Sequence, residues 1–533
     1  MKATNISWIT LFLVISFLFN VDSIPLKVST DDEMFIKIDI KNKSDIDNLC
    51  RKGVNIISDF DNFVLARSDK NSIEFLKKSG LNYIVLDEII VNRSYYYVWP
   101  LDNKAERAVS LYSKILLKRG DFFIIRFDDS TKLKQLMQFR IELARISINP
   151  MQINTKITEF PIVNHNPTVQ EIVNRVNSDS VLGFVWRLSN FQTRYSSTDS
   201  CQAAADYIKY QFETYGLDSV YFQEFDSTYA PNVIGIKQGK LYPDSIYTVL
   251  CGHYDCTSQN PFNFAPGADD NGSGATSVLE AVRVMQGYNC EKSLRFIAFC
   301  GEEQGLIGSN YYASQALNRG DSILGVINVD MVAYSLPNRD SASIIGKPSN
   351  PNCAPLVDYF ITCADTYTLL KTQRQIIDRP RSDHASFNQY GFTAIHCREN
   401  LNINNPYYHT TGDSIGGGFN ALNLCTDVIK AAVATVTSLA VPVGTGIMEA
   451  KASQTAFRVT PNPSSKIIKV EFIPSNNRSE IKIFDITGRV KKRLITNRNL
   501  GSVHIDVSEL KSGIYFIELK NSGNRLNNKL IIR

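Results

Sequence analysis

The chain has 533 residues, which at about 150 residues per domain predicts three or four domains. Apolar residues make up 44% and charged residues 21%, a composition that excludes wholesale disorder, collagen and coiled coil. The net charge is only +4, although residues 457–533 contain 15 Lys/Arg and 6 Asp/Glu, a net +9 that leaves −5 for the rest. So small an overall excess argues against nucleic acid as a partner.

The N-terminus has the layout of a secretory signal peptide. Lys2 precedes a mostly apolar stretch from Ile6 to Phe19, and Ser23 is the small residue after it. We therefore expect a signal peptide at residues 1–23, with a buried N-terminal helix as the alternative. This stretch is too short for a permanent span and no later segment has 18 uninterrupted apolar residues, so we expect no transmembrane segment.

Residues 24–165 alternate short apolar strands with helical stretches, which predicts a small α+β region. The expected strands are Met34–Ile40, Phe63–Ala66, Tyr83–Leu86 and Phe122–Phe127, and the expected helices are Ser44–Gly53, Asn71–Ser79 and Ser130–Ile146. The aromatic run from Tyr95 to Tyr97 favours packing over a ligand platform. No catalytic constellation occurs here, so we interpret the region as an accessory region or pro-region.

The remaining chain divides into an α/β domain and an all-β domain. In residues 166–442, strands such as Ile246–Leu250 and Leu294–Phe299 alternate with helices, which predicts a mixed sheet with helices on both faces. Residues 443–456 have the composition of a linker. In residues 457–533, short strands recur with turn residues between them, which predicts a small β-sandwich.

Ten cysteines bear on the compartment and on metal binding. Eight of them lie between residues 251 and 425, and no two form a CxxC pair, which argues against a structural zinc ribbon. Outside the cytosol some of them would form disulfides, and buried free thiols are an equally open alternative.

Five segments of the middle domain carry histidines and carboxylates in an order that suggests a metal site. They are Cys251–Asp255, Pro266–Gly274, Gly301–Glu303, Asn328–Met331 and Tyr407–Thr411. Three of them follow expected strands, and ligands of open α/β sheets gather at the carboxyl ends of strands. Imidazole and carboxylate donors suit zinc. Two histidines and three carboxylates would give each of two ions two private ligands and one shared ligand.

These motifs resemble the double-zinc aminopeptidases of metallopeptidase family twenty-eight, which also contains glutamate carboxypeptidases and relatives of glutaminyl cyclase. The resemblance extends from Thr168 to Val441 and includes Arg194–Ser196 and Ala230–Val233. It implies the zinc exopeptidase fold and a ligand set divided between two zinc ions. One zinc would be held by His253 and Asp330, the other by Glu303 and His409, and Asp270 would bridge them, with Asp269 as the alternative bridge.

The resemblance also implies roles for three further residues. Glu302 would act as the general base on the bridging water and return the proton to the leaving amine. Asp255 would hydrogen-bond the imidazole of His253 and fix its orientation. Tyr408 would donate a hydrogen bond to the developing oxyanion.

The other histidines fall into two groups. Ser382-Asp383-His384 resembles a supporting segment near the site, although this chain has Arg379 where other members place a tyrosine. His165, His396 and His504 have no carboxylate partner in motif spacing, so we expect them to be structural.

The last region resembles the C-terminal sorting domain of type nine secretion substrates. The segments that carry this resemblance are Val459–Pro463, Ile483–Arg489 and Leu510–Tyr515. It implies the type nine secretion machinery as a partner and Gram-negative export through the periplasm, followed by release or attachment to the cell surface. A generic binding sandwich, such as a carbohydrate-binding module, is the alternative.

Taken with the signal sequence, these features predict a secreted zinc exopeptidase, an aminopeptidase that removes N-terminal residues from peptides. A glutaminyl-cyclase-like acyl transferase with one zinc and a carboxypeptidase of the same fold are the alternatives. A non-catalytic binding protein is a third possibility, against which the intact Glu302 argues.

Overall fold

The computed structural model describes residues 33–443 and 457–533, apart from residues 61, 91–92, 153–156, 473–477, 486–488, 497–499 and 522–523. The predicted signal peptide and nearly all of the predicted linker lie outside the described residues. The chain divides into two compact units, of which the first ends at Pro442 and the second holds residues 443–533 together with Gly287–Asn289.

Two successive β-α-β-β-α-β units form the N-terminal region. The first consists of β1 (Met34–Asp39), α1 (Lys43–Arg51), β2 (Asn55–Asp59), β3 (Phe63–Ser68), α2 (Lys70–Ser79) and β4 (Tyr83–Asp87). The second consists of β5 (Ser94–Pro100), α3 (Asn103–Tyr112), β6 (Lys114–Arg119), β7 (Phe122–Phe127), α4 (Ser130–Leu136) and β8 (Ile141–Ile146). Their antiparallel sheets have the equivalent orders β2-β3-β1-β4 and β6-β7-β5-β8, so the region is an internal structural repeat.

The sequence specifies the start of each of these four helices. Asn42, Asp69, Asp102 and Asp129 precede α1 to α4, and each side chain accepts a backbone N–H of the first helical turn. Such caps satisfy amides that have no partner inside the helix.

One expected element of this region is wrong. The helix expected at Ser130–Ile146 ends at Leu136, and Ile141–Ile146 is the strand β8. Leu143 packs toward α3 and α4, whereas Ala144 packs between the two sheets. A strand that is buried on both faces does not alternate between apolar and polar residues, so its pattern does not separate it from a helix.

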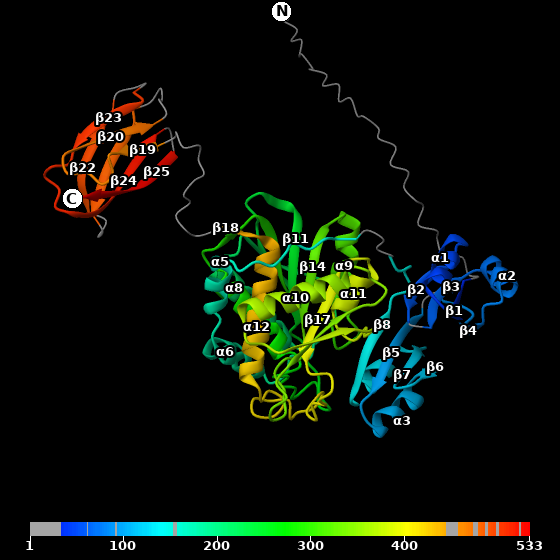
Figure 1. The fold of residues 1–533 in the computed structure, drawn as a ribbon. Coiled ribbons are helices and arrows are strands. Elements are labelled where there is room, and N and C mark those ends of the chain that lie inside the picture. The colour runs from blue at the N-terminus through cyan, green and yellow to red at the C-terminus, as the bar shows by residue number, and fades with distance from the viewer. Residues whose placement is uncertain are drawn as a thin grey trace, which may run out of the picture. The chain divides into compact units, whose positions relative to one another are not determined.

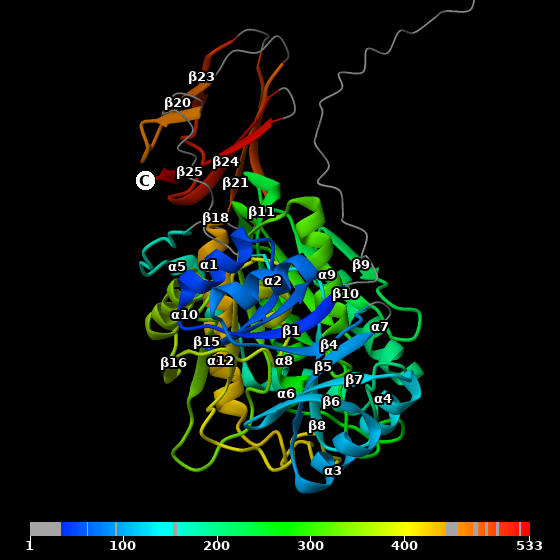
Figure 2. The ribbon, with the colours of Figure 1, turned by 90° about the vertical axis from the view of Figure 1, so that its right-hand side faces the viewer.

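The two N-terminal sheets share an apolar core with the α/β domain at residues 166–442. Phe35, Tyr95 and Trp99 lie in this core, and Leu306 of the α/β domain completes it. The aromatic run from Tyr95 to Tyr97 is buried, as expected for a packing role. Figure 2 shows the strands of both N-terminal sheets in front of the α/β domain.

An eight-stranded mixed sheet forms the centre of the α/β domain, in the order β16-β15-β17-β14-β11-β13-β10-β9. Its strands are β9 (Ser219–Gln223), β10 (Asn232–Lys237), β11 (Tyr242–His253), β13 (Lys292–Phe299), β14 (Ser322–Val329), β15 (Ala342–Gly346), β16 (Thr372–Ile376) and β17 (Ala394–Glu399). Strand β11 is parallel to both β13 and β14. Strand β10 is antiparallel to β13, and β9 is antiparallel to β10. Two short strands, β12 (Asn289–Cys290) and β18 (Pro442–Val443), pair with each other.

Helices cover both faces of this sheet, which confirms the expected architecture (Figure 1). They are α5 (Pro167–Asn174), α6 (Ser178–Ser189), α7 (Asp199–Thr214), α8 (Gly272–Val284), α9 (Ile307–Arg319), α10 (Cys353–Tyr367), α11 (His384–Gln389) and α12 (Leu422–Ala440). Helices α5, α8 and α10 contact α12, and α9 contacts α11. By length and composition α12 could cross a membrane, but most of its residues are buried in this domain.

The second unit contains two antiparallel sheets with a common apolar core, as expected for a sandwich. Its strands are β19 (Phe457–Thr460), β20 (Ile467–Phe472), β21 (Glu480–Asp485), β22 (Val490–Ile495), β23 (Ser502–Asp506), β24 (Gly513–Asn521) and β25 (Asn524–Ile532). The sheet orders are β19-β20-β23 and β22-β21-β24-β25.

All ten cysteines are among the described residues, and all are free thiols. Cys201 Sγ and Cys300 Sγ lie 3.8 Å apart without a bond. Of the two alternatives for the cysteines, the structure has the free thiols, and nine of the ten are buried.

Candidate metal centre

The five predicted metal ligands come together at one edge of the central sheet. His253 is the last residue of β11, Glu303 follows the end of β13, and Asp330 directly follows β14. These three strands are parallel neighbours, so their carboxyl ends lie at the same edge. Asp270 lies just before α8, and His409 lies in the loop that precedes α12.

Distances within the group divide the ligands into two sets around one carboxylate. His409 Nε2 lies 3.0 Å from Asp270 Oδ2 and 3.1 Å from Glu303 Oε2. His253 Nε2 lies 3.5 Å from Asp270 Oδ1 and 3.5 Å from Asp330 Oδ1. Asp270 therefore directs one oxygen toward each imidazole, which is the position of a bridging ligand.

The buried donors of this group fit a metal cation. Glu303 Oε1 and Asp330 Oδ1 are buried and have no hydrogen-bond partner among the described residues. Burial raises the pKa of Glu303 to about 7, because charged carboxylates are costly to bury without compensation. The carboxylate Glu303 in turn raises the pKa of His409 against the effect of burial. A dication would offset this crowded negative charge, and the imidazole and carboxylate donors suit zinc.

Glu302 lies beside the set that contains His253. Its Oε2 is 3.9 Å from His253 Nε2, and its ligand-type atoms gather with those of His253 and Asp330 within 4.8 Å. Burial raises the pKa of Glu302 well above its usual value, and Glu303 and Asp330 raise it further. A raised pKa suits a carboxylate that takes up a proton and gives it back near neutral pH.

Asp255 lies against the imidazole of His253 with both its backbone oxygen and its carboxylate. His253 Nδ1 lies 3.1 Å from the backbone oxygen of Asp255 and 3.5 Å from Oδ1 of its carboxylate, so the backbone oxygen orients the imidazole. The carboxylate accepts the backbone N–H groups of Glu302 at 3.4 Å and Glu303 at 3.3 Å. Asp255 thus helps to position His253, Glu302 and Glu303.

Two groups that hold the ligands in place were not predicted. The carboxylate of Asp413 accepts the backbone N–H groups of Asp269 at 3.0 Å and Asp270 at 2.9 Å. His409 Nδ1 lies 2.6 Å from the backbone oxygen of Ile141, which belongs to β8 of the N-terminal region. Asp413 follows His409 by four residues and could have been suspected from that spacing, whereas no local signal identifies Ile141.

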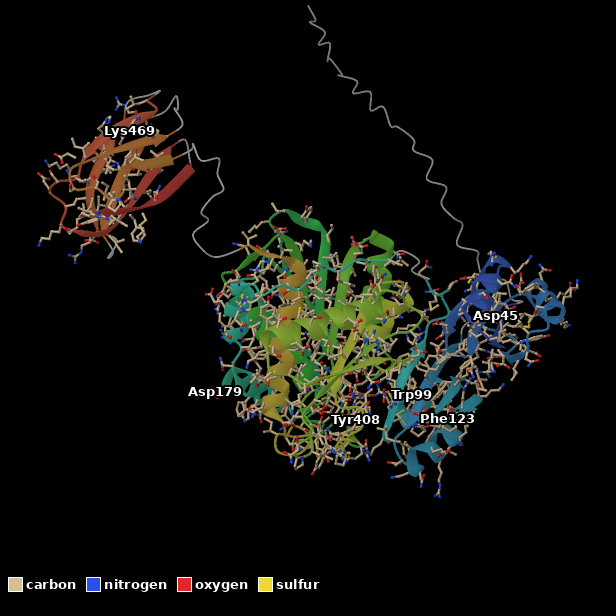
Figure 3. All side chains as sticks on the ribbon, viewed as in Figure 1. Asp45, Trp99, Phe123, Asp179, Tyr408 and Lys469 are labelled. Carbon is tan, nitrogen blue, oxygen red and sulfur yellow. The ribbon has the colours of Figure 1, made fainter. Side chains whose placement is uncertain are left out.

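Tyr408 lies against the ligand that follows it in sequence. The centroids of the Tyr408 and His409 rings are 4.0 Å apart. Burial, with the charges of Glu142 and Asp270, raises the pKa of Tyr408 well above its usual value, so the phenol stays protonated as a donor. Figure 3 shows Tyr408 at the edge of the catalytic domain that the N-terminal strands approach, with Trp99 on the N-terminal side.

One histidine that we expected to be structural lies beside the site. His384 stacks on His396 with 4.9 Å between ring centroids, and His396 Nε2 lies 3.8 Å from Oδ2 of the ligand Asp330. His396 therefore lies beside the site, although it has no carboxylate partner in motif spacing. The contact arises because β17 pairs with β14, where His396 is opposite Asn328, and such pairing is not visible in the local sequence.

Buried imidazole and carboxylate donors at the carboxyl ends of strands in a mixed α/β sheet form a candidate site for divalent metal ions. Residues 232–432 match the model of peptidase family M28, and residues 458–533 match that of a secretion system C-terminal sorting domain. The chain is therefore a metallopeptidase with an export module.

Two similar proteins with curated names match somewhat more than half of this chain. A probable leucine aminopeptidase of Arthroderma benhamiae is 27% identical over 287 residues, which are 52% of this chain and 76% of that protein. A leucine aminopeptidase 1 of Trichophyton rubrum is 26% identical over 342 residues, which are 59% of this chain and 88% of that protein.

Two solved structures from Legionella pneumophila share the fold. The LapA aminopeptidase superposes with a TM-score of 0.55 and 21% identity, over 65% of this chain and 98% of that one. LapB superposes with a TM-score of 0.50 and 21% identity, over 77% of this chain and all of that one.

Proposed function

We propose that this chain is a secreted zinc aminopeptidase that binds two zinc ions and hydrolyses N-terminal residues from peptides. The observation that carries the proposal is the position of Asp270, which directs one oxygen toward His253 and the other toward His409. The leucine aminopeptidases among its relatives support the direction of cleavage. A cyclase with a single zinc would need neither the second histidine nor a bridging carboxylate.

Each residue of the site has a role in this reaction. His253 and Asp330 would hold one zinc, Glu303 and His409 the other, and Asp270 both. When bound, zinc supplies a Lewis acid that polarises the substrate carbonyl and acidifies the attacking water. Glu302 takes the proton from that water and returns it to the leaving amine, for which its raised pKa is suited. The protonated phenol of Tyr408 donates to the oxyanion.

The N-terminal region, residues 24–165, acts in this proposal as a pro-region that restrains the site. Three consecutive residues of this region contact the catalytic domain. Arg140 Nη2 donates to the backbone oxygen of Tyr408 at 2.9 Å, Ile141 accepts from His409, and Glu142 pairs with Arg381. The loop that carries His409 is thereby fixed to β8, so its freedom depends on the N-terminal region.

In this proposal, the two ends of the chain act in export. Residues 1–23 would direct the chain into the periplasm of a Gram-negative cell, and the sorting domain at residues 458–533 would deliver it to the type nine secretion machinery. Release from the cell or attachment to its surface would follow.

A screen of peptides with free and with blocked N-termini tests the reaction, with and without a chelator. We expect cleavage of the free-amine substrates only, loss of cleavage with the chelator, and two zinc ions per active chain. Cleavage of blocked peptides from the C-terminal side would identify a carboxypeptidase instead. Cyclisation of N-terminal glutamine with one zinc would identify a cyclase.

A further inference from the structure

Three arginines of the catalytic domain gather beside the metal centre, and the reaction described above uses none of them. Arg379 and Arg381 lie in the loop between β16 and α11, and Arg398 lies on β17. The side chains of Arg381 and Arg398 are only 15% and 12% exposed. Burial, together with the charges of Arg398 and Arg381, lowers the pKa of Arg379 to about 9. These three residues are here called the arginine cluster.

The arginine cluster approaches the metal centre from two sides. Arg398 Nη2 lies 3.7 Å from Sδ of Met331, which directly follows the predicted ligand Asp330. Arg381 pairs with Glu142, next to Ile141, whose backbone oxygen contacts the predicted ligand His409. The cluster is therefore next to the space where a substrate would meet the ligands.

A carboxylate already occupies the arginine cluster, and it comes from the N-terminal region. Arg381 Nε and Nη2 each donate to one oxygen of Glu142 on β8. The guanidinium of Arg381 also lies over the ring of Trp99, 4.9 Å from its centroid. Burial raises the pKa of Glu142, but the arginine cluster outweighs this effect and holds the pKa below its usual value. Glu142 directly follows Ile141, whose backbone oxygen orients the ligand His409.

The arginine cluster retains donors that Glu142 does not use. The Nε atoms of Arg379 and Arg398 are buried and have no hydrogen-bond partner among the described residues. Guanidinium groups recognise planar carboxylates through paired hydrogen bonds. We propose that the arginine cluster is a subsite for a substrate carboxylate, and that Glu142 occupies it as an internal mimic while the N-terminal region is docked.

This proposal rests on the proposed peptidase function and names its substrate class. The substrates are peptides that carry a carboxylate close to the bond that is cleaved. That carboxylate is either the side chain of an acidic residue or the C-terminus of a very short peptide. Both present the same group to the arginine cluster.

Binding of succinate to the zinc-loaded full chain tests the subsite without any turnover. In Glu142→Ala the internal carboxylate is removed, so we expect millimolar succinate to bind in calorimetry and to raise the midpoint of thermal unfolding. The native chain should bind succinate at least roughly tenfold more weakly, because Glu142 fills the site. Equal, weak binding to both chains would overturn the proposal.

Two variants separate this result from other causes. Glu142→Ala with Arg381→Ala should lose the succinate binding, whereas succinate that binds zinc directly would still bind this double variant. Asp59→Ala is the matched control, because Asp59 is also a buried carboxylate of the N-terminal region and pairs with Lys347 of the catalytic domain at 2.8 Å. Succinate should not stabilise it. If Glu142→Ala does not fold, Glu142→Gln preserves the side-chain volume for the same measurements.

Turnover by the Glu142→Ala chain identifies the source of the carboxylate. Faster cleavage of N-terminal glutamate than of N-terminal glutamine would assign the subsite to an acidic side chain. Faster cleavage of a dipeptide than of its amide would assign it to the C-terminus. Arg381→Ala should reduce either preference roughly tenfold, and cleavage with neither preference would overturn the proposal. If no peptide is cleaved at all, the peptidase function fails, while the succinate result still decides the subsite.

Discussion

Arg194 is completely buried and connects segments of the chain that lead to the predicted metal ligands. Its guanidinium donates to the backbone oxygens of Tyr254, Pro266 and Gly267, each at 2.7 Å, and to that of Leu188 at 2.9 Å. The side chain thereby connects the end of β11 with the loop that leads to Asp270. An arginine can do this because it offers five donors in a fixed plane.

Replacing Arg194 should therefore destabilise the folded chain. In Arg194→Met we expect the free energy of unfolding to fall by at least about 3 kcal/mol, because four backbone oxygens lose a buried charged donor. Zinc affinity should fall as well. Arg374→Met is the control, because Arg374 is about half exposed and pairs with Asp358 at the surface, where such a pair contributes about 0–1 kcal/mol. Equal losses in urea unfolding of the two variants would contradict this account.

Glu302 can be tested independently of the ligands. In Glu302→Gln the rate of peptide cleavage should fall by about 10²–10⁴-fold, since the amide cannot accept the proton of the attacking water. The zinc content should not change, because the five ligands remain. Loss of zinc together with activity would show instead that Glu302 is itself a ligand. The zinc measurement is needed because Glu302 Oε2 lies only 3.9 Å from His253 Nε2.

At the scale of elements, the start of α8 positions Asp270, the proposed bridging carboxylate. Asn271 caps the helix by accepting the backbone N–H of Gly274 at 2.7 Å, and its side-chain amide donates to Val329 at the end of β14 at 3.1 Å. A Cβ atom on Gly274 would lie 2.1 Å from the Val329 oxygen and 2.3 Å from Asn271 Oδ1. The helix can approach β14 this closely only with glycine at this position.

Substitution by alanine should therefore have opposite effects on stability at two glycines inside helices. In Gly274→Ala we expect a loss of stability of several kcal/mol and of activity, because the helix start must move away from β14 and carries Asp270 with it. Gly183 lies in α6 with nothing within 4 Å of an added Cβ. Gly183→Ala should be neutral or stabilise the chain by up to about 1 kcal/mol. Thermal unfolding and peptide cleavage measure both effects.

At the scale of the whole molecule, two buried ion pairs join the N-terminal region to the catalytic domain. Glu142 pairs with Arg381, and Asp59 pairs with Lys347. Burial raises the pKa of each carboxyl group, but its partner outweighs burial and lowers the pKa below the ordinary value of 4.5 for Glu142 and 3.8 for Asp59. These contacts are therefore sensitive to acid.

A carboxyl group whose pKa is lowered by folding contributes stability above its unfolded pKa, and this stability is lost as the pH falls through the folded pKa. We therefore expect the N-terminal region to be held firmly at pH 6 and more weakly below about pH 4. Hydrogen exchange of Ile141–Ile146 at the two pH values measures this change. A variant with Glu142→Gln and Asp59→Asn should show a smaller difference. Equal protection of the native chain at both pH values would contradict the prediction.

The sequence by itself grouped the predicted ligands and indicated the framework that presents them. His253, Asp330 and Glu303 follow strands, and the carboxyl ends of parallel strands meet at one edge, so local pattern and spacing were sufficient to group them. The caps of the N-terminal helices are likewise specified by single residues next to them.

Only the tertiary structure decided which distant groups complete the site. His396 reaches Asp330 through the pairing of β17 with β14, and Ile141 reaches His409 from a strand that resembled a helix. Glu142 meets Arg381 across 239 positions of sequence. Contacts of this kind depend on how apolar faces pack against one another, and packing is set by the whole fold because no local pattern of residues encodes it.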